Sequence, residues 1–121
     1  MMQVLTIDDS ATMRKIIKDF LGKMGDYTIT EAENCDDGLK KLAATKMDLI
    51  LVDWNMPGMS GIDFVKTVRG VPNLAKTPIV MITSNAEKEQ VLSAVMAGVN
   101  AYIVKPFTAD IFTQKLSEVI G

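Results

Sequence analysis

The chain of 121 residues contains no histidine and one cysteine, Cys35. Without histidine it cannot build a histidine-based zinc site or a Ser-His or Cys-His nucleophilic pair, and it cannot act as a phosphohistidine donor. A single cysteine cannot form an internal disulfide, which is typical of proteins in the reducing cytoplasm. We interpret Cys35, at the start of a predicted helix, as an inert thiol; a reactive thiol is the functional alternative.

Long apolar runs and an excess of one charge are also missing. No stretch approaches the length of a membrane span, and the first residues lack the basic and apolar segments of a signal peptide. The net charge of −2 favours neither nucleic acid nor a membrane surface as a partner. With 48% hydrophobic residues, the composition predicts a single globular domain over residues 1–121, located in the cytoplasm.

The sequence shows a regular alternation of β-rich runs and helical stripes. Strands are predicted at residues 3–7, 27–32, 48–53, 78–84 and 101–105, and each is followed by apolar residues at helical spacing. Helix caps are predicted at Asn34, Ser60 and Thr108. The stripes predicted to face the core include Met13, Ile16, Met24, Leu92, Met96 and Ile111. This pattern predicts an α/β fold of three layers, a five-stranded parallel sheet covered on both faces by five helices.

Polar residues end four of the five predicted strands. These residues are Asp8 with Asp9, Asp53, Thr83 with Ser84, and Lys105. In a parallel α/β sheet the carboxyl ends of the strands meet at one edge, where ligands bind. Three carboxylates there would repel one another unless a cation lies among them, and oxygen ligands suit Mg²⁺. A carboxylate beside Mg²⁺ can attack phosphorus to form an aspartyl phosphate, whose oxygens an ammonium and a hydroxyl can hold.

Each of these residues also has an ordinary structural interpretation. Asp9 or Ser10 could cap a helix, and Asp53 could be a turn residue. Thr83 is a good β-former, and Lys105 could be a solvated charge. The combination favours one phosphoryl site, because independent caps and turns would rarely coincide at four strand ends.

Four motifs at these strand ends resemble the receiver domains of two-component response regulators: "IDDS", "VDWNMP", "ITS" and "YIVKPF". Within that family the chain is most similar to the single-domain chemotaxis regulators, through "DDSATMR", "DWNMP" and "VKPFTA". The resemblance covers the whole chain and leaves nothing for an output domain. It implies a flavodoxin-like sheet with the strand order 2-1-3-4-5.

The resemblance also implies a role for each polar residue at the sheet edge. Asp53 is then the phosphoacceptor, and Mg²⁺ is bound by Asp8, Asp9, Asp53 and the backbone carbonyl of Asn55. Lys105 contacts the phosphoryl group, and the peptide bond from this lysine to the following proline is cis.

A switch and a partner surface follow from the same resemblance. Thr83 is the switch hydroxyl, and Tyr102 is the aromatic residue whose burial changes with it; an exposed strand aromatic is the alternative for Tyr102. The surface that meets partners is made by Lys88, Val91, Val95, Tyr102 and Lys115. Asn85 is neutral where the family is often acidic, and Glu118 stands where a lysine is common, which leaves the phosphoryl lifetime and the choice of partner open.

The predicted function is a cytoplasmic, Mg²⁺-dependent phosphoaspartate switch of the chemotaxis type. A histidine kinase donates the phosphoryl group, and the modified monomer binds the flagellar motor switch, with a phosphatase as a further candidate partner. The protein is then a signalling protein that assists its own phosphorylation and dephosphorylation, and not an enzyme of metabolism.

Three alternatives remain from the sequence. The chain could be a stand-alone receiver in a phosphorelay or a kinase adaptor. A Mg²⁺-dependent aspartyl phosphatase would need a second acid/base carboxylate and a substrate pocket, for which the chain has no insertion. A flavin-binding module would need a Ser/Thr/Gly-rich phosphate loop after the first strand, where this chain carries two carboxylates.

Overall fold

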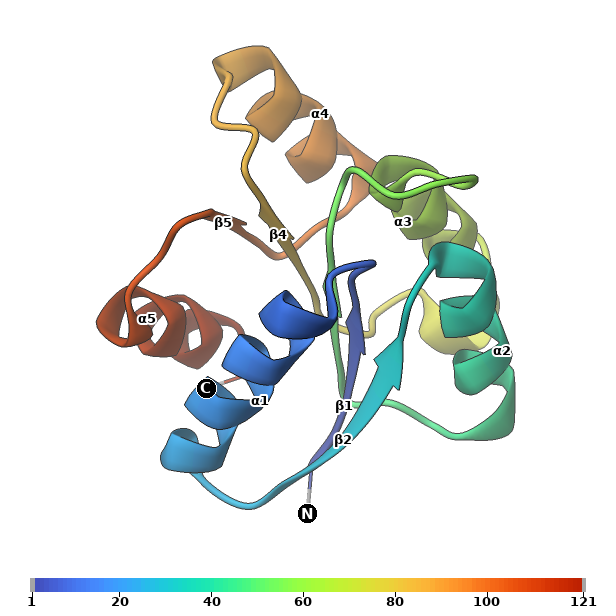
Figure 1. The fold of residues 1–121 in the computed structure, drawn as a ribbon. Helices are drawn as coiled ribbons and strands as arrows, with labels where there is room; N and C mark the ends of the chain where they lie inside the picture. The colour runs from blue at the N-terminus through green and yellow to red at the C-terminus, as the bar shows by residue number, and fades with distance from the viewer. Residues whose placement is uncertain (1, 121) are drawn as a thin grey trace.

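The computed structural model describes residues 2–120, in which strands alternate with α-helices (Figure 1). The elements are β1 (Met2–Ile7), α1 (Ala11–Met24), β2 (Tyr27–Ala32), α2 (Cys35–Ala44), β3 (Leu49–Val52), α3 (Gly61–Arg69), the 3₁₀ helix η1 (Pro72–Leu74), β4 (Ile79–Thr83), α4 (Lys88–Ala97), β5 (Ala101–Val104) and α5 (Ala109–Ile120). Within the described residues, no helix combines the length and the apolarity that a membrane span requires.

The five strands form one parallel sheet in the order β2-β1-β3-β4-β5, as predicted. The register aligns the carboxyl ends of the central strands, because Ile7 pairs with Ala32 on one side and with Val52 on the other. On β4, Thr83 pairs with Val104 of β5. The residues that follow β1, β3 and β5 therefore meet at one edge, toward which β1 and β2 point in Figure 1.

Helices cover both faces of the sheet. The helices α1 and α5 lie on one face, and α2, α3 and α4 lie on the other (Figure 1). Every residue of β3 and β4 is buried, which explains why these strands have no alternating polar positions. On the α1/α5 face, the rings of Phe20 and Phe107 each pack 5.6 Å from the ring of Phe112.

The predicted helix caps are confirmed. The side chains of Asn34 and Ser60 accept hydrogen bonds from backbone N–H groups in the first turns of α2 and α3. The Thr108 hydroxyl accepts from the N–H of Ile111 at 3.2 Å. At α1 the cap is Ser10, so Asp9 does not have that structural role. Side-chain oxygens at these positions satisfy N–H groups that have no partner within the helix.

Several apolar residues predicted to face the core are exposed instead. Met96 is 79% exposed and Leu92 56%, because α4 packs on the sheet through the fully buried Ala94. On α5, Ile111 is 46% exposed beside the buried Phe112. On α1, Ile16 is 36% exposed because its neighbour Ile17 occupies the position that faces the core. Met13 and Met24 pack against the core as predicted. Adjacent residues point about 100° apart on a helix, so only one of each apolar pair can face the sheet squarely.

Candidate functional site

Three aspartates meet at the carboxyl edge of the sheet. Each of Asp8, Asp9 and Asp53 offers a carboxylate oxygen, and these oxygens all lie within 4.8 Å of one another. The backbone N–H of Asp53 donates to the carbonyl of Ile7 at 3.1 Å, and that of Asp8 donates to the carbonyl of Ala32 at the same distance. The strand ladders thus continue one residue beyond the strand ends and hold the acidic residues side by side, as the sequence predicted.

Two of these carboxylates are buried, and one ammonium contacts both. Asp8 is 2% exposed and Asp53 7% exposed, whereas Asp9 is exposed. The Lys105 Nζ lies 2.9 Å from Asp8 Oδ2 and 3.2 Å from Asp53 Oδ2. The backbone N–H of Lys105 donates to the Thr83 carbonyl at 2.9 Å, and the peptide bond to Pro106 is cis, as predicted.

The pKa values of the cluster follow from burial and charge. Burial alone would lower the pKa of Lys105, but its contacts with Asp8 and Asp53 outweigh burial and raise it. Burial raises the pKa of Asp53; the nearby Asp8 carboxylate adds to this, while Lys105 and the N–H of Asn55 oppose it. Lys105 therefore stays protonated at neutral pH, and a further positive charge beside Asp53 would favour the ionised form of its carboxylate.

This donor set fits a divalent magnesium ion. Three carboxylates face one ammonium, so the cluster keeps an excess of negative charge. All three groups offer carboxylate oxygens, which a hard cation such as Mg²⁺ prefers. Within residues 2–120 this is the one group of three or more acidic, histidine or cysteine side chains close enough to share an ion. That the Asn55 backbone carbonyl is a fourth ligand of the ion remains a prediction.

Gly61 packs closely against the backbone of Asp53, a contact that the sequence did not predict. Its N–H donates to the Trp54 carbonyl at 2.9 Å, which joins the start of α3 to the segment after β3. A Cβ at Gly61 would lie 2.1 Å from the carbonyl oxygen of Asp53. The available signal was a glycine at the first position of a helix, which does not reveal a close approach to another segment.

A chain of hydrogen bonds leads from the sheet edge to the surface. Thr83 is fully buried, and its Oγ1 accepts from the backbone N–H of Asn85 at 3.4 Å. The Tyr102 hydroxyl donates to the Asn85 carbonyl at 2.6 Å. Burial raises the pKa of Tyr102, with a contribution from the charge of Asp53. Tyr102 is half-buried and anchored, so its interpretation as an exposed strand aromatic is wrong.

The residues predicted to meet partners lie on α4, β5 and α5, and both helices contact β5. Lys88 and Val95 are exposed, while Val91, Tyr102 and Lys115 are partly buried. The exposed side chains of Leu92 and Met96, which the sequence placed in the core, enlarge the apolar part of α4 that faces solvent. Contiguous apolar patches that face solvent are typical of interaction surfaces.

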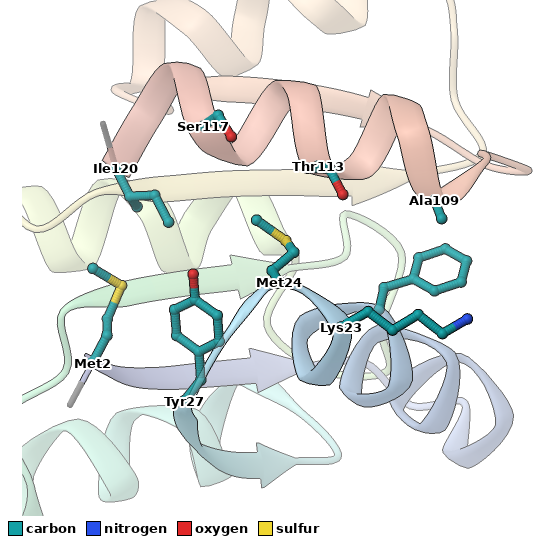
Figure 2. Close-up of a pocket in the computed structure, with 9 residues that line it drawn as sticks. Met2, Lys23, Met24, Tyr27, Ala109, Thr113, Ser117 and Ile120 are labelled. Carbon is teal, nitrogen blue, oxygen red and sulfur yellow. The ribbon is translucent and has the colours of Figure 1, made fainter.

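A hollow of about 570 Å³ lies elsewhere, between α1 and α5 (Figure 2). Its described lining residues are Met2, Phe20, Lys23, Met24, Tyr27, Ala109, Thr113, Ser117 and Ile120. Figure 2 shows the side chains of Met24, Tyr27 and Thr113 pointing into it from α1, β2 and α5. None of these lining residues belongs to the acidic cluster, so the hollow is separate from the site at the sheet edge.

Cys35 is an inert thiol, as predicted. Its side chain is 1% exposed, and its Sγ donates to the Ser60 carbonyl at 3.7 Å. Burial raises its pKa to about 12, with further contributions from the charges of Asp36, Asp53 and Asp63. A thiol of this kind has almost no thiolate at neutral pH.

Comparisons with known proteins agree with the fold. Residues 4–117 match the family model of the response regulator receiver domain. The chain is 41% identical over 118 residues to the chemotaxis protein CheY of Pseudomonas aeruginosa, covering 98% of this chain and 95% of that protein. It is 46% identical over 121 residues to CheY-3 of Vibrio cholerae serotype O1, covering 98% and 91%.

The solved structures give the same result. The chemotaxis protein CheY4 of Vibrio cholerae superposes with a TM-score of 0.91 at 33% identity, over 98% of both chains. The strand order, the acidic edge and these matches agree, and the chain therefore belongs to the response regulator receiver family, with CheY proteins of chemotaxis among its relatives.

Proposed function

We propose that this chain is a Mg²⁺-dependent phosphoaspartate switch of bacterial chemotaxis. Asp53 accepts a phosphoryl group from a histidine kinase in the cytoplasm, and the modified monomer binds the flagellar motor switch. The observation that carries the proposal is the buried Asp53 carboxylate, grouped with Asp8 and Asp9 and bonded to Lys105 at the carboxyl edge. The chemotaxis proteins among its relatives support the choice of pathway.

In the proposed reaction, an Asp53 oxygen attacks the donor's phosphorus. A new P–O bond forms while the bond to the donor's imidazole nitrogen breaks, and that nitrogen keeps the electron pair. The Lys105 ammonium, kept protonated by its two carboxylate contacts, holds a phosphoryl oxygen. A Mg²⁺ ion held by Asp8, Asp9, Asp53 and the Asn55 carbonyl would supply positive charge against the other oxygens.

The signal reaches the surface through Thr83, Asn85 and Tyr102. A phosphoryl group adds negative charge and strong acceptor oxygens at the sheet edge, which attract the Thr83 hydroxyl. In the unphosphorylated structure, Thr83 Oγ1 accepts a hydrogen bond from the Asn85 N–H, and the Asn85 carbonyl accepts one from the Tyr102 hydroxyl. A shift of the hydroxyl therefore changes the segment that anchors Tyr102, beside the partner surface on α4 and α5.

The acceptor is tested by labelling with acetyl phosphate and Mg²⁺. The protein should gain one acid-stable, base-labile phosphoryl group, measured by intact mass. Asp53→Asn should abolish the label, because an amide cannot form the acyl phosphate. Asp63→Asn is the matched control, since Asp63 is an exposed carboxylate on α3 and should not be needed. Labelling of Asp53→Asn at the wild-type rate would remove Asp53 as the acceptor.

The switch is tested with beryllofluoride and Mg²⁺, which mimic the phosphorylated carboxylate. Beryllofluoride should tighten binding to a peptide from the flagellar switch protein, measured by fluorescence anisotropy. Thr83→Ala should keep labelling but lose most of the tightening, whereas Thr67→Ala, which removes an exposed hydroxyl of α3, should change neither. Equal affinity with and without beryllofluoride would favour a phosphorelay or kinase-adaptor role instead.

A further inference from the structure

The Arg14 side chain joins three parts of the structure near the acidic cluster. From α1 its Nε donates to Glu31 Oε1 at 3.0 Å, at the end of β2. Its NH1 donates to the backbone carbonyl of Asp8, in the loop between β1 and α1. The Arg14 side chain is 16% exposed, whereas that of Glu31 is 38% exposed, so the arginine is the more buried partner of this ion pair. The planar, forked guanidinium meets the two acceptors with two different nitrogens, Nε and NH1, held in a fixed relative geometry.

The carbonyl that Arg14 contacts belongs to the peptide unit leading into Asp9. The carboxylate of Asp8 is held independently by Lys105 and by the N–H of Ser10. Asp9 is different, because its exposed carboxylate has no hydrogen bond or ion pair within residues 2–120. Its place in the cluster therefore depends on the orientation of the backbone that carries it.

We infer that Arg14 is a positioning residue of the acidic site: it fixes the peptide between Asp8 and Asp9, and so holds the Asp9 carboxylate where it can share a cation with Asp8 and Asp53. Glu31 anchors the guanidinium from the opposite side. The inference rests on the proposed function, in which this cluster binds Mg²⁺. It adds a residue outside the ligand set to the residues that determine Mg²⁺ affinity.

Lys18 provides a matched control. Its Nζ lies 3.3 Å from Glu31 Oε2, so it contacts the same carboxylate as Arg14 from the same helix. Among the described contacts of Lys18, none reaches Asp8. Replacing either cation by glutamine removes one positive charge from the group around Glu31. Simple electrostatics predicts that both changes tighten Mg²⁺ binding, whereas positioning predicts that Arg14→Gln alone weakens it.

The experiment compares wild type, Arg14→Gln, Arg14→Lys and Lys18→Gln. Mg²⁺ affinity is measured by titration of Trp54 fluorescence, and the mobility of the loop by amide hydrogen exchange at Asp9 and Ser10 in the metal-free protein. Arg14→Gln should weaken Mg²⁺ binding about tenfold and speed exchange at both amides. Arg14→Lys should fall between this variant and wild type, because it keeps the charge but not the fork. Lys18→Gln should not weaken binding.

The outcomes separate the two proposals. If Arg14→Gln binds Mg²⁺ as tightly as wild type, or if Lys18→Gln weakens binding equally, the positioning role is refuted. If wild type itself binds no Mg²⁺, the proposed function fails. In that case the exchange rates still decide whether Arg14 holds the loop: unchanged exchange in Arg14→Gln refutes it, and faster exchange supports it.

Discussion

Replacing Gly61 by alanine tests whether the start of α3 holds Asp53 in place. The added Cβ would lie 2.1 Å from the Asp53 carbonyl oxygen and 2.9 Å from the Trp54 Cα. Ordinary van der Waals contact begins at 3.4 Å, so the overlap with the oxygen exceeds an ångström. Both neighbours are backbone atoms and cannot rotate away. Either the segment after β3 or the first turn of α3 must move.

This clash determines how much the free energy of unfolding should fall in Gly61→Ala. Overpacking of a buried site costs about 1–3 kcal/mol, and a backbone clash of this size belongs at the upper end of that range. Displacement of Asp53 by about an ångström should also slow labelling by acetyl phosphate up to about a hundredfold. Stability is measured by urea unfolding followed by far-UV circular dichroism, because Trp54 fluorescence would respond to the local shift itself.

Gly22 provides the control. It lies within α1, where an added Cβ has no described atom within 4 Å beyond its own helix and chain neighbours. Gly22→Ala should therefore stabilise the protein by about 0.5–1 kcal/mol. Adding Gly22→Ala to Gly61→Ala recovers part of the lost stability, so a persistent labelling defect would report geometry and not unfolding. Wild-type stability and labelling in Gly61→Ala would refute this reasoning.

Three further results are expected. Asp53→Asn should make the metal-free protein more stable than wild type at pH 7. The folded-state pKa of Asp53 is raised above its ordinary value of 3.8, so wild type loses the stability linked to protonation of this group as the pH rises through the folded-state pKa. Urea titrations at several pH values should show the stability difference between the two proteins shrinking as the pH falls toward 3.8. Cys35, with its pKa raised to about 12, should react with a disulfide reagent at pH 8 only after unfolding in urea, and rapid reaction in the native state would contradict its burial. Arg69→Leu should lower the free energy of unfolding in urea by about 3 kcal/mol, and a loss below about 1 kcal/mol would show that the hydrogen bonds of this guanidinium are dispensable. The guanidinium donates to the backbone carbonyls of Leu74, Ala75, Thr77 and Gly98 and to the Asn100 side chain.

Local patterns in the sequence were enough to predict most of the fold. Strand and helix periods and the caps at Asn34, Ser60 and Thr108 depend on neighbours within a few residues, so they can be read directly. Parallel topology then brings the strand ends together, which is why the convergence of Asp8, Asp53 and Lys105 could be predicted. The strand order came from the family resemblance and not from these patterns.

The tertiary structure decided which side chains are covered and what lies close across the chain. Met96 and Ala94 belong to the same apolar stretch, but only the packing of α4 on the sheet determines that Ala94 is buried and Met96 is exposed. The contact of Arg14 with the Asp8 carbonyl and the approach of Gly61 to Asp53 depend on elements whose relative position is set by long-range packing. The residues next to a position in the sequence do not predict such distances, because the distances arise only when separate helices and strands pack around one core.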